Sequence, residues 1–214
     1  MHTQSKETQE KLTPDEAIQL LKEGNERFVK DMRADRKFSK QVIDTSAGQF
    51  PFATILSCMD SRTSAELIFD QGIGDIFSIR VAGNILNDDI IGSMEYGCKV
   101  VGTKVILVLG HTKCGAVAGA CDNVELGNIT ALLNKIKPAI EKESSFKDNR
   151  TSKNSDYVNK VTEINVRMVM ERVTEESEII RELEKEGKVR IIGGVYDVES
   201  GRVEFFKEDK GIES

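Results

Sequence analysis

Apolar residues in this chain occur in short, nearly continuous runs that are separated by stretches of helical periodicity. A short run with few polar residues is typical of a strand buried on both faces of a parallel sheet. Four such runs are present: Phe52–Leu56, Ile76–Ile79, Val105–Leu109 and Val189–Val195. A fifth run, Val203–Phe206, follows a turn at Glu199-Ser200-Gly201, so it predicts an antiparallel edge strand.

The stretches between these runs predict helices. Thr13 is a suitable N-cap, Pro14 suits the first helical position, and apolar residues then recur at helical spacing as far as Val29. Further helices are expected at 65–69, 88–98, 115–120, 128–140 and 158–183. The charged, aperiodic segment 33–48 predicts a surface loop, and 141–155 predicts a polar connection.

Strands that alternate with helices indicate a doubly wound α/β fold with right-handed crossovers. We expect a single domain over residues 13–214, preceded by a polar leader at 1–12. Its mostly parallel central sheet should have the strand order 2-1-3-4-5, with the last strand antiparallel and helices on both faces. In such sheets the active site lies at the carboxyl ends of the strands, where the strand order reverses. This order makes the ends of the first and third strands neighbours.

Composition narrows the class of protein. The chain has 214 residues, 39% of them hydrophobic and 31% charged, which is ordinary for a globular domain. The net charge of −6 and the lack of a basic stripe argue against nucleic acid as a partner, and no apolar run is long enough to span a membrane. Four cysteines in a chain of this length favour free thiols or metal ligands over a disulfide scaffold. The leader has no hydrophobic signal core, so a cytoplasmic location is expected, or a periplasmic one if a signal peptide has been removed.

Two of these strands end in residues that bind metals. Cys58 follows the first strand, while His111 and Cys114 follow the third. Thiolate sulfur and imidazole nitrogen suit zinc, and three protein ligands leave one position open for catalysis. The alternative is that both cysteines are small buried thiols. Packing is the expected role of Cys98 and Cys121, and the chain's other histidine, His2, lies in the leader.

Asp60 and Arg62 lie just beyond the first of these ligands. In the simpler interpretation Asp60 caps the next helix and Arg62 is a surface charge. In the other, Arg62 keeps the carboxylate ionised and directed toward the open metal position, where it would orient a hydroxide nucleophile.

Two motifs give the chain a family resemblance. Cys58-x-Asp60-Ser61-Arg62, followed by His111-x-x-Cys114-Gly115, resembles the β-class carbonic anhydrases, and Arg80-Val-Ala-Gly-Asn84 lies between the two motifs. The similarity extends from about Leu12 to Phe206. It implies reversible hydration of carbon dioxide to bicarbonate and a proton, with one Zn²⁺ per subunit bound by Cys58, His111 and Cys114, and with Asp60 and Arg62 as the catalytic dyad. No organic cofactor is implied.

The resemblance also implies a substrate pocket and a subgroup. Gln49, Phe77, Ala82 and Tyr96 match positions that line the carbon dioxide pocket of plant-like members. In the family Gln49, Phe77 and Tyr96 reach the site from a partner subunit, so a homodimer or homotetramer is implied. The chain has no tryptophan, and Ile55 stands near the place where bicarbonate-regulated members carry one. An open, plant-like site is therefore expected, with Asp60 binding zinc only in a closed, inactive state.

Three other functions use the same residues. A related zinc hydrolase could act on carbonyl sulfide or carbon disulfide. A structural zinc ion could support a non-catalytic interaction module. Cys114 and His111 could also form a cysteine-nucleophile site, but Cys58 would then have no role. For the carbonic anhydrase, two thiolates on the metal predict activity that rises toward alkaline pH.

Overall fold

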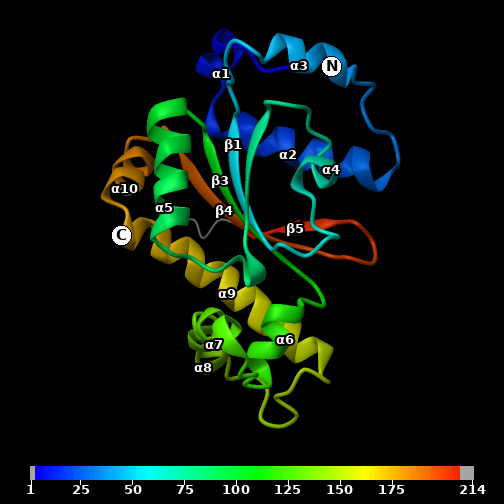
Figure 1. Ribbon diagram of the computed structural model, residues 1–214, viewed down its shortest axis with the longest axis vertical. Coiled ribbons are helices and arrows are strands. Elements are labelled where there is room, and N and C mark those ends of the chain that lie inside the picture. Colours follow the sequence, from blue (N-terminus) through cyan, green and yellow to red (C-terminus); the bar gives the residue numbers. More distant parts are fainter. Residues whose placement is uncertain (1–2, 208–214) are drawn as a thin grey trace.

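A five-stranded sheet forms the centre of the molecule (Figure 1). The computed structural model describes residues 3–207, so His2 and residues 208–214 of the expected domain lie outside the described residues. The strand order is β2-β1-β3-β4-β5, in which only β5 pairs in the antiparallel direction. This confirms the expected fold class, strand order and edge strand. The strands are β1 (Ala53–Ser57), β2 (Ile76–Arg80), β3 (Val105–His111), β4 (Arg190–Tyr196) and β5 (Val203–Phe205).

The register of the central strands brings two distant segments together. β1 and β3 are parallel neighbours, and Ser57 at the end of β1 pairs with Leu109 of β3. Cys58 therefore leaves the sheet beside the Gly110-His111 end of β3. Both strands are buried along their whole length, which explains why most of their residues are apolar.

Helices cover both faces of the sheet. Their bounds are α1 (Lys6–Lys11), α2 (Pro14–Val29), α3 (Phe38–Asp44), α4 (Ala65–Ile68), α5 (Asp88–Glu95), α6 (Gly115–Cys121), α7 (Gly127–Asn134), α8 (Lys137–Lys142), α9 (Ser155–Glu176) and α10 (Glu178–Lys185), with a 3-10 turn η1 (Ala82–Asn84) and a π-helical turn η2 (Tyr96–Val101). In the described part of the chain no helix combines the length and the apolar character needed to cross a membrane.

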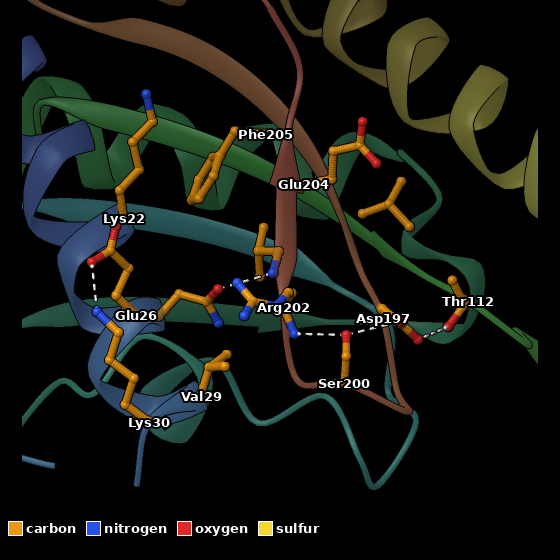
Figure 2. Close-up of a pocket in the computed structure, with 13 residues that line it drawn as sticks. Lys22, Glu26, Val29, Lys30, Thr112, Asp197, Ser200, Arg202, Glu204 and Phe205 are labelled. Atoms are coloured by element: carbon orange, nitrogen blue, oxygen red, sulfur yellow. Dashed lines mark hydrogen bonds and ion pairs between the residues drawn. The ribbon is translucent and has the colours of Figure 1, made fainter. Parts of the chain in front are cut away.

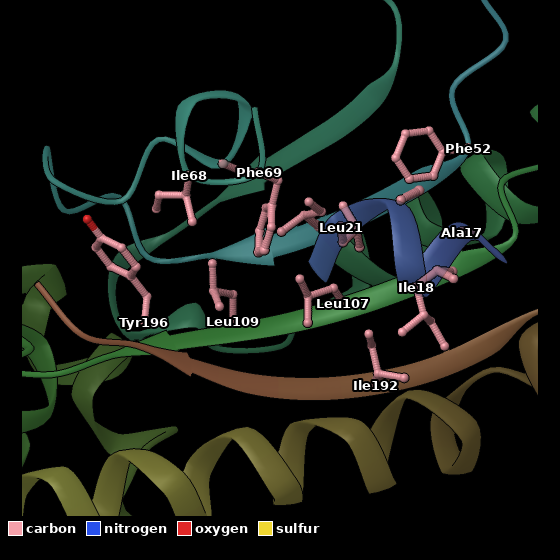
Figure 3. Packing of buried hydrophobic residues seen from close by; sticks show 14 residues of the cluster. Ala17, Ile18, Leu21, Phe52, Ile68, Phe69, Leu107, Leu109, Ile192 and Tyr196 are labelled. Atoms are coloured by element: carbon pink, nitrogen blue, oxygen red, sulfur yellow. The ribbon is translucent and has the colours of Figure 1, made fainter. Parts of the chain in front are cut away.

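Alternate residues of each central strand enter different cores because side chains on a strand point to opposite faces. Residues of α2 and α4 pack on one face, where Leu21 and Phe69 meet Leu107 and Leu109 of β3 (Figure 3). On the other face α5, α9 and α10 cover Leu56, Ile106 and Val108. A third cluster lies beyond the strand ends, between α6, α8 and α9, and it includes Cys58 and Cys114. The candidate ligands thus sit at the edge of a packed apolar region.

Two segments carry helices that the sequence pattern did not predict. The polar leader contains α1, whose Gln9 is buried and donates to the carbonyl oxygens of Pro51 (2.7 Å) and Val101 (3.1 Å). The prediction of a loop at 33–48 is wrong, because residues 38–44 form α3. Its apolar Phe38 and Ile43 face outward and its buried contact is the polar Gln41, so hydrophobic periodicity gave no signal.

Two helices expected to be continuous are divided. The stretch 128–140 forms α7 and α8, with Pro138 in the first turn of α8. The stretch 158–183 is broken at Ser177, where the backbone is extended and the hydroxyl caps α10 by accepting from Ile180 N (3.1 Å). The same hydroxyl donates to Glu95 of α5 (2.6 Å), so a contact from outside the helix stabilises the break.

Candidate functional site

Three buried ligand atoms converge at the carboxyl ends of β1 and β3. The sulfur atoms of Cys58 and Cys114 and a ring nitrogen of His111 all lie within 4.8 Å of one another. Cys58 follows β1, His111 ends β3, and Cys114 is the residue preceding α6. Lys113 adopts a left-handed backbone (φ 55°), which turns the chain sharply enough to bring Cys114 back beside His111.

The imidazole of His111 is oriented for coordination. Its Nδ1 lies 2.9 Å from the carbonyl oxygen of Thr112, which can only accept, so Nδ1 carries the proton and donates. Nε2 is therefore an acceptor, and it is buried without a hydrogen-bond partner among the described residues. A buried, unpaired nitrogen facing two sulfur atoms fits a thiophilic cation such as zinc.

The two thiols also fit a cation. The hydrogen bond from the Cys114 thiol to the sulfur of Cys58 outweighs burial and lowers the pKa of Cys58 well below its usual range. The same bond, together with burial, raises the pKa of Cys114. One thiolate is thus already favoured at neutral pH, and a divalent cation between the sulfur atoms would displace the remaining proton.

Asp60 forms a bidentate pair with Arg62 beside the ligand cluster. Arg62 donates from Nε to Oδ1 (2.9 Å) and from Nη2 to Oδ2 (2.7 Å), and its backbone N–H also donates to Oδ1 (3.0 Å). The hydrogen bonds from Arg62 outweigh burial and hold the pKa of Asp60 well below its usual range, so the group is a carboxylate at neutral pH. Asp60 does not cap α4, which begins after Ser64. Its Oδ2 lies 3.9 Å from Nε2 of His111, at the border of the space between the ligand atoms.

The loop that carries Cys58 and Asp60 is fixed by two further residues. Arg80, at the end of β2, donates to the carbonyl oxygens of Cys58 (3.2 Å) and Asp60 (2.6 Å). Thr63 donates its hydroxyl to the same two oxygens, at 2.8 and 2.9 Å. Sequence reasoning gave neither residue a role. The sequence feature that could have indicated a role for Arg80 is its position at the end of the strand expected next to β1.

The loop that carries His111 and Cys114 is fixed from the β4–β5 turn. Thr112 donates its hydroxyl to Asp197 (3.2 Å) and accepts from the backbone N–H of Val198 (3.1 Å). Lys113 forms an ion pair with Glu199 (2.5 Å). The contact between Thr112 and Asp197 borders a groove of about 790 Å³ between α2 and β5, in which Figure 2 shows Thr112, Asp197 and Ser200 joined by hydrogen bonds. The groove contains none of the three ligands.

Of the residues matched to a substrate pocket, Gln49 and Tyr96 are exposed on the single chain, whereas Phe77 and Ala82 are half-buried. The ring centroids of Phe77 and Tyr96 are 6.3 Å apart and their planes are tilted by 51°, in a groove of about 460 Å³ along the edge strand β2. Tyr96 is 51% exposed, and Gln49 is also exposed, in the coil before β1. Ala82 lies in η1, next to Gly83, whose backbone N–H donates to Sγ of Cys58 (3.3 Å). None of the three candidate metal ligands lines this groove. Within one chain, Phe77 and Tyr96 therefore lie in a different groove from the candidate ligands.

The other two cysteines are buried but do not belong to the group of three candidate ligands. Cys98 lies 3.4 Å from the hydroxyl of Thr103, and burial raises its pKa to about 11. Cys121 packs in the third core cluster, where burial also raises its pKa. Both are therefore protonated and unreactive at neutral pH.

Comparison with known proteins gives a consistent picture. Residues 53–203 match the family model described as carbonic anhydrase. Carbonic anhydrase 2 of Mycobacterium tuberculosis is 35% identical over 202 residues, which cover 88% of this chain and 91% of that protein. The crystal structure of the β-carbonic anhydrase CafA of Aspergillus fumigatus superposes with a TM-score of 0.69 at 25% identity, over 79% of this chain and 81% of that one. A tetrameric β-carbonic anhydrase of Sordaria macrospora has the same fold, with a TM-score of 0.69 at 23% identity over 79% of this chain and 91% of that one.

Proposed function

This chain belongs to the carbonic anhydrase family and to its β class, and from this premise we propose that it hydrates carbon dioxide reversibly to bicarbonate and a proton. The observation that carries the proposal is the buried cluster of two sulfur atoms and an unpaired imidazole nitrogen, which fits zinc. Cys58, His111 and Cys114 would hold the ion, one per subunit. When bound, zinc would acidify a water molecule and so supply hydroxide near neutral pH.

Asp60 and Arg62 would direct the attack. The carboxylate of Asp60 can only accept hydrogen bonds, so it would accept one from the attacking hydroxide and turn a lone pair of that oxygen toward the carbon of the substrate. Arg62 would keep Asp60 ionised and fixed, because it satisfies both carboxylate oxygens from one rigid guanidinium group. A small apolar pocket would hold carbon dioxide nearby.

Metal analysis combined with stopped-flow carbon dioxide hydration tests this function. Cys58→Ser and His111→Ala should lose bound zinc and hydration activity together. Cys98→Ala and Cys121→Ala are the matched controls, since both cysteines are buried outside the cluster, and they should keep both properties. A wild-type protein that binds zinc at this cluster but does not hydrate carbon dioxide would refute the proposal.

The ligand set also predicts how activity depends on pH. Two thiolates bring two negative charges to the ion and weaken its Lewis acidity, compared with a site of three neutral imidazoles. The reactive hydroxide should therefore form at higher pH, and kcat/KM should rise from neutral toward alkaline pH. A flat profile over this range would contradict the charge argument.

We also propose that the site is of the open, plant-like kind. Asp60 is engaged with Arg62 through both oxygens, and Ile55 stands where a regulatory tryptophan would be expected. X-ray absorption at the zinc edge should then be the same for wild type and Asp60→Asn at neutral pH. A change in the light-atom ligands of the variant would show that Asp60 coordinates the metal.

Self-association would complete the substrate pocket. The proposal is supported by the groove of Phe77 and Tyr96, which opens on the edge of β2 away from this chain's own ligands, and by the tetrameric relative in Sordaria macrospora. Mass measured by light scattering should correspond to a dimer or tetramer. A mixture of Cys58→Ser and Tyr96→Ala subunits should recover part of the activity that each variant lacks, because a mixed dimer contains one complete site. No recovery in a mixture shown to form mixed dimers would place Tyr96 outside the partner's site.

The rival functions are not favoured. A structural zinc site needs four protein ligands, whereas the cluster offers three and Asp60 is paired with Arg62. Hydrolysis of carbonyl sulfide or carbon disulfide would use the same ligands, but the family model and the similar proteins described above are carbonic anhydrases. Assays with each substrate separate the two reactions.

A further inference from the structure

A backbone N–H group points at one of the ligand sulfur atoms. The amide nitrogen of Gly83 lies 3.3 Å from Sγ of Cys58, in a buried position. Hydrogen bonds to ligand atoms tune a metal centre, because they draw charge away from the ligand and fix its orientation. This contact is therefore placed to reduce the charge that Cys58 presents to a cation.

The backbone that makes this contact has an unusual conformation. Gly83 has φ 67° and ψ 16°, and the next residue, Asn84, has φ 41°. Two successive residues thus occupy the left-handed region, in which a residue other than glycine is strained by roughly 1–2 kcal/mol. Such a conformation persists only where surrounding contacts determine it.

A buried side chain from another element supplies such a contact. Asn165 lies on α9 and is only 3% exposed. Its Nδ2 donates to the carbonyl oxygen of Gly83 at 3.0 Å. Gly83 is therefore held at both of its peptide groups, by Asn165 at the carbonyl and by Cys58 at the N–H.

We propose that Asn165 is a positioning residue of the metal centre: it holds Gly83 so that the N–H of Gly83 donates to the thiolate of Cys58, which offsets part of the negative charge of the two thiolates. The inference rests on the proposed assignment of Cys58 as a metal ligand, and it is independent of which substrate is used. Without Asn165 the thiolate of Cys58 would be more electron-rich and less well fixed.

Replacement of Asn165 has a defined expected effect. Asn165→Leu removes the side-chain amide at similar volume, and Asn165→Asp removes the NH2 donor at nearly the same shape. We expect either change to weaken metal binding about tenfold, the low end for loss of a hydrogen-bond partner behind a metal ligand. In the cobalt-substituted protein the thiolate-to-cobalt charge-transfer band should move to lower energy, and the pH at which hydration activity is half-maximal should move to a more alkaline value.

Val169→Ala is the matched control. Val169 lies on the same helix, is 2% exposed and belongs to the core that α5, α9 and α10 form on one face of the sheet. The variant therefore weakens the packing of α9 without removing a contact to Gly83. It should lower thermal stability yet leave the cobalt band and the pH midpoint at their wild-type positions. If Asn165→Leu lowers thermal stability but leaves the cobalt band and the pH midpoint at their wild-type positions, as expected for Val169→Ala, Asn165 has only a structural role and the proposal is wrong.

A measurement on the wild-type protein does not depend on whether a variant folds. With ¹¹³Cd as the probe, NMR should detect scalar coupling between the metal and the amide proton of Gly83, transmitted through the N–H···S hydrogen bond. Cadmium bound to Cys58 without this coupling would overturn the proposal and leave the metal assignment intact. No cadmium coupling to the side-chain protons of Cys58 would instead overturn the metal assignment, and this inference with it.

Discussion

Replacement of Gly83 by alanine should destabilise the protein for two separable reasons. The first is the backbone, since φ is 67° and an L side chain in that region costs roughly 1–2 kcal/mol. The second is space, because an added Cβ would lie 2.7 Å from Cδ1 of Ile136, which is fully buried, and 3.3 Å from Cβ of Ala116. An extra methyl group in a packed core costs about 1–3 kcal/mol.

Together these terms predict that Gly83→Ala lowers the free energy of unfolding by roughly 2–5 kcal/mol. In a protein of this size the melting temperature should fall by roughly 2–4 °C per kcal/mol. Gly187→Ala is a matched control for the backbone term alone, because Gly187 has φ 69° and no atom within 4 Å of the added Cβ. Its expected cost is about 1–2 kcal/mol.

A double-mutant cycle with Ile136→Val isolates the steric term. This substitution removes Cδ1, the atom that the new methyl group would meet, and alone should cost about 0.5–1.5 kcal/mol. In the Ile136→Val background, Gly83→Ala should cost less than in the wild type and approach the cost of Gly187→Ala, because the 2.7 Å contact is removed and the 3.3 Å contact with Ala116 remains. Urea unfolding of the four proteins gives the coupling energy. The reasoning is refuted if Gly83→Ala costs the same in both backgrounds, or no more than Gly187→Ala in the wild type.

Three further predictions concern charged side chains. Asp60→Asn should keep stoichiometric zinc but reduce kcat about 10–100-fold, the usual cost of losing a group that orients a ligand at a metal, and unchanged turnover in stopped-flow assays would refute its role. Asp70→Ala should lower the free energy of unfolding by about 3–5 kcal/mol, because it removes the buried partner of Arg27 and Arg36; a loss below about 1 kcal/mol in urea would show that the cluster contributes little. Burial of Glu143 is outweighed by hydrogen bonds from Ser145 and by Arg150, so its pKa is lowered, and the stability it contributes should be present above about pH 4.3 and lost as the pH falls through its lower folded value. Thermal melts from neutral to acid pH should therefore fall less steeply for Glu143→Gln than for wild type; identical slopes would contradict this assignment.

Hydrophobic pattern was sufficient to predict the sheet. Strands buried on both faces are mostly apolar, so the segments that form β1 and β3 were recognisable as apolar runs in the sequence. The rules for parallel sheets then placed Cys58 beside His111. The convergence of the three ligand atoms follows from those two facts and a tight turn at Lys113. The convergence of these three side chains was thus predictable from local signals and topology.

Contacts between distant elements were not predictable in the same way. Asn165 reaches Gly83 from the middle of a helix, and Asp197 reaches Thr112 from the β4–β5 turn. Neither contact has a local sequence pattern, because each depends on how two elements pack. For the same reason the helix around Gln41 was missed, since its buried contact is polar and its apolar side chains face outward. Residues that would come from a partner subunit are a further case, because no property of one chain determines the partner's position.

The pairing of β1 with β3 also bears on the order of events during folding. β2 and α5 lie between these strands in the sequence, yet the strands are direct neighbours in the sheet and end in different ligands. Long-range strand pairing forms slowly, because loop closure costs entropy before contacts compensate for it. A refolding chain should therefore form its helices before Cys58 and His111 are brought together. During refolding with Co²⁺, the thiolate-to-cobalt absorption should lag behind the recovery of helical circular dichroism. Metal binding would then stabilise chains with a fully paired sheet relative to partly folded chains.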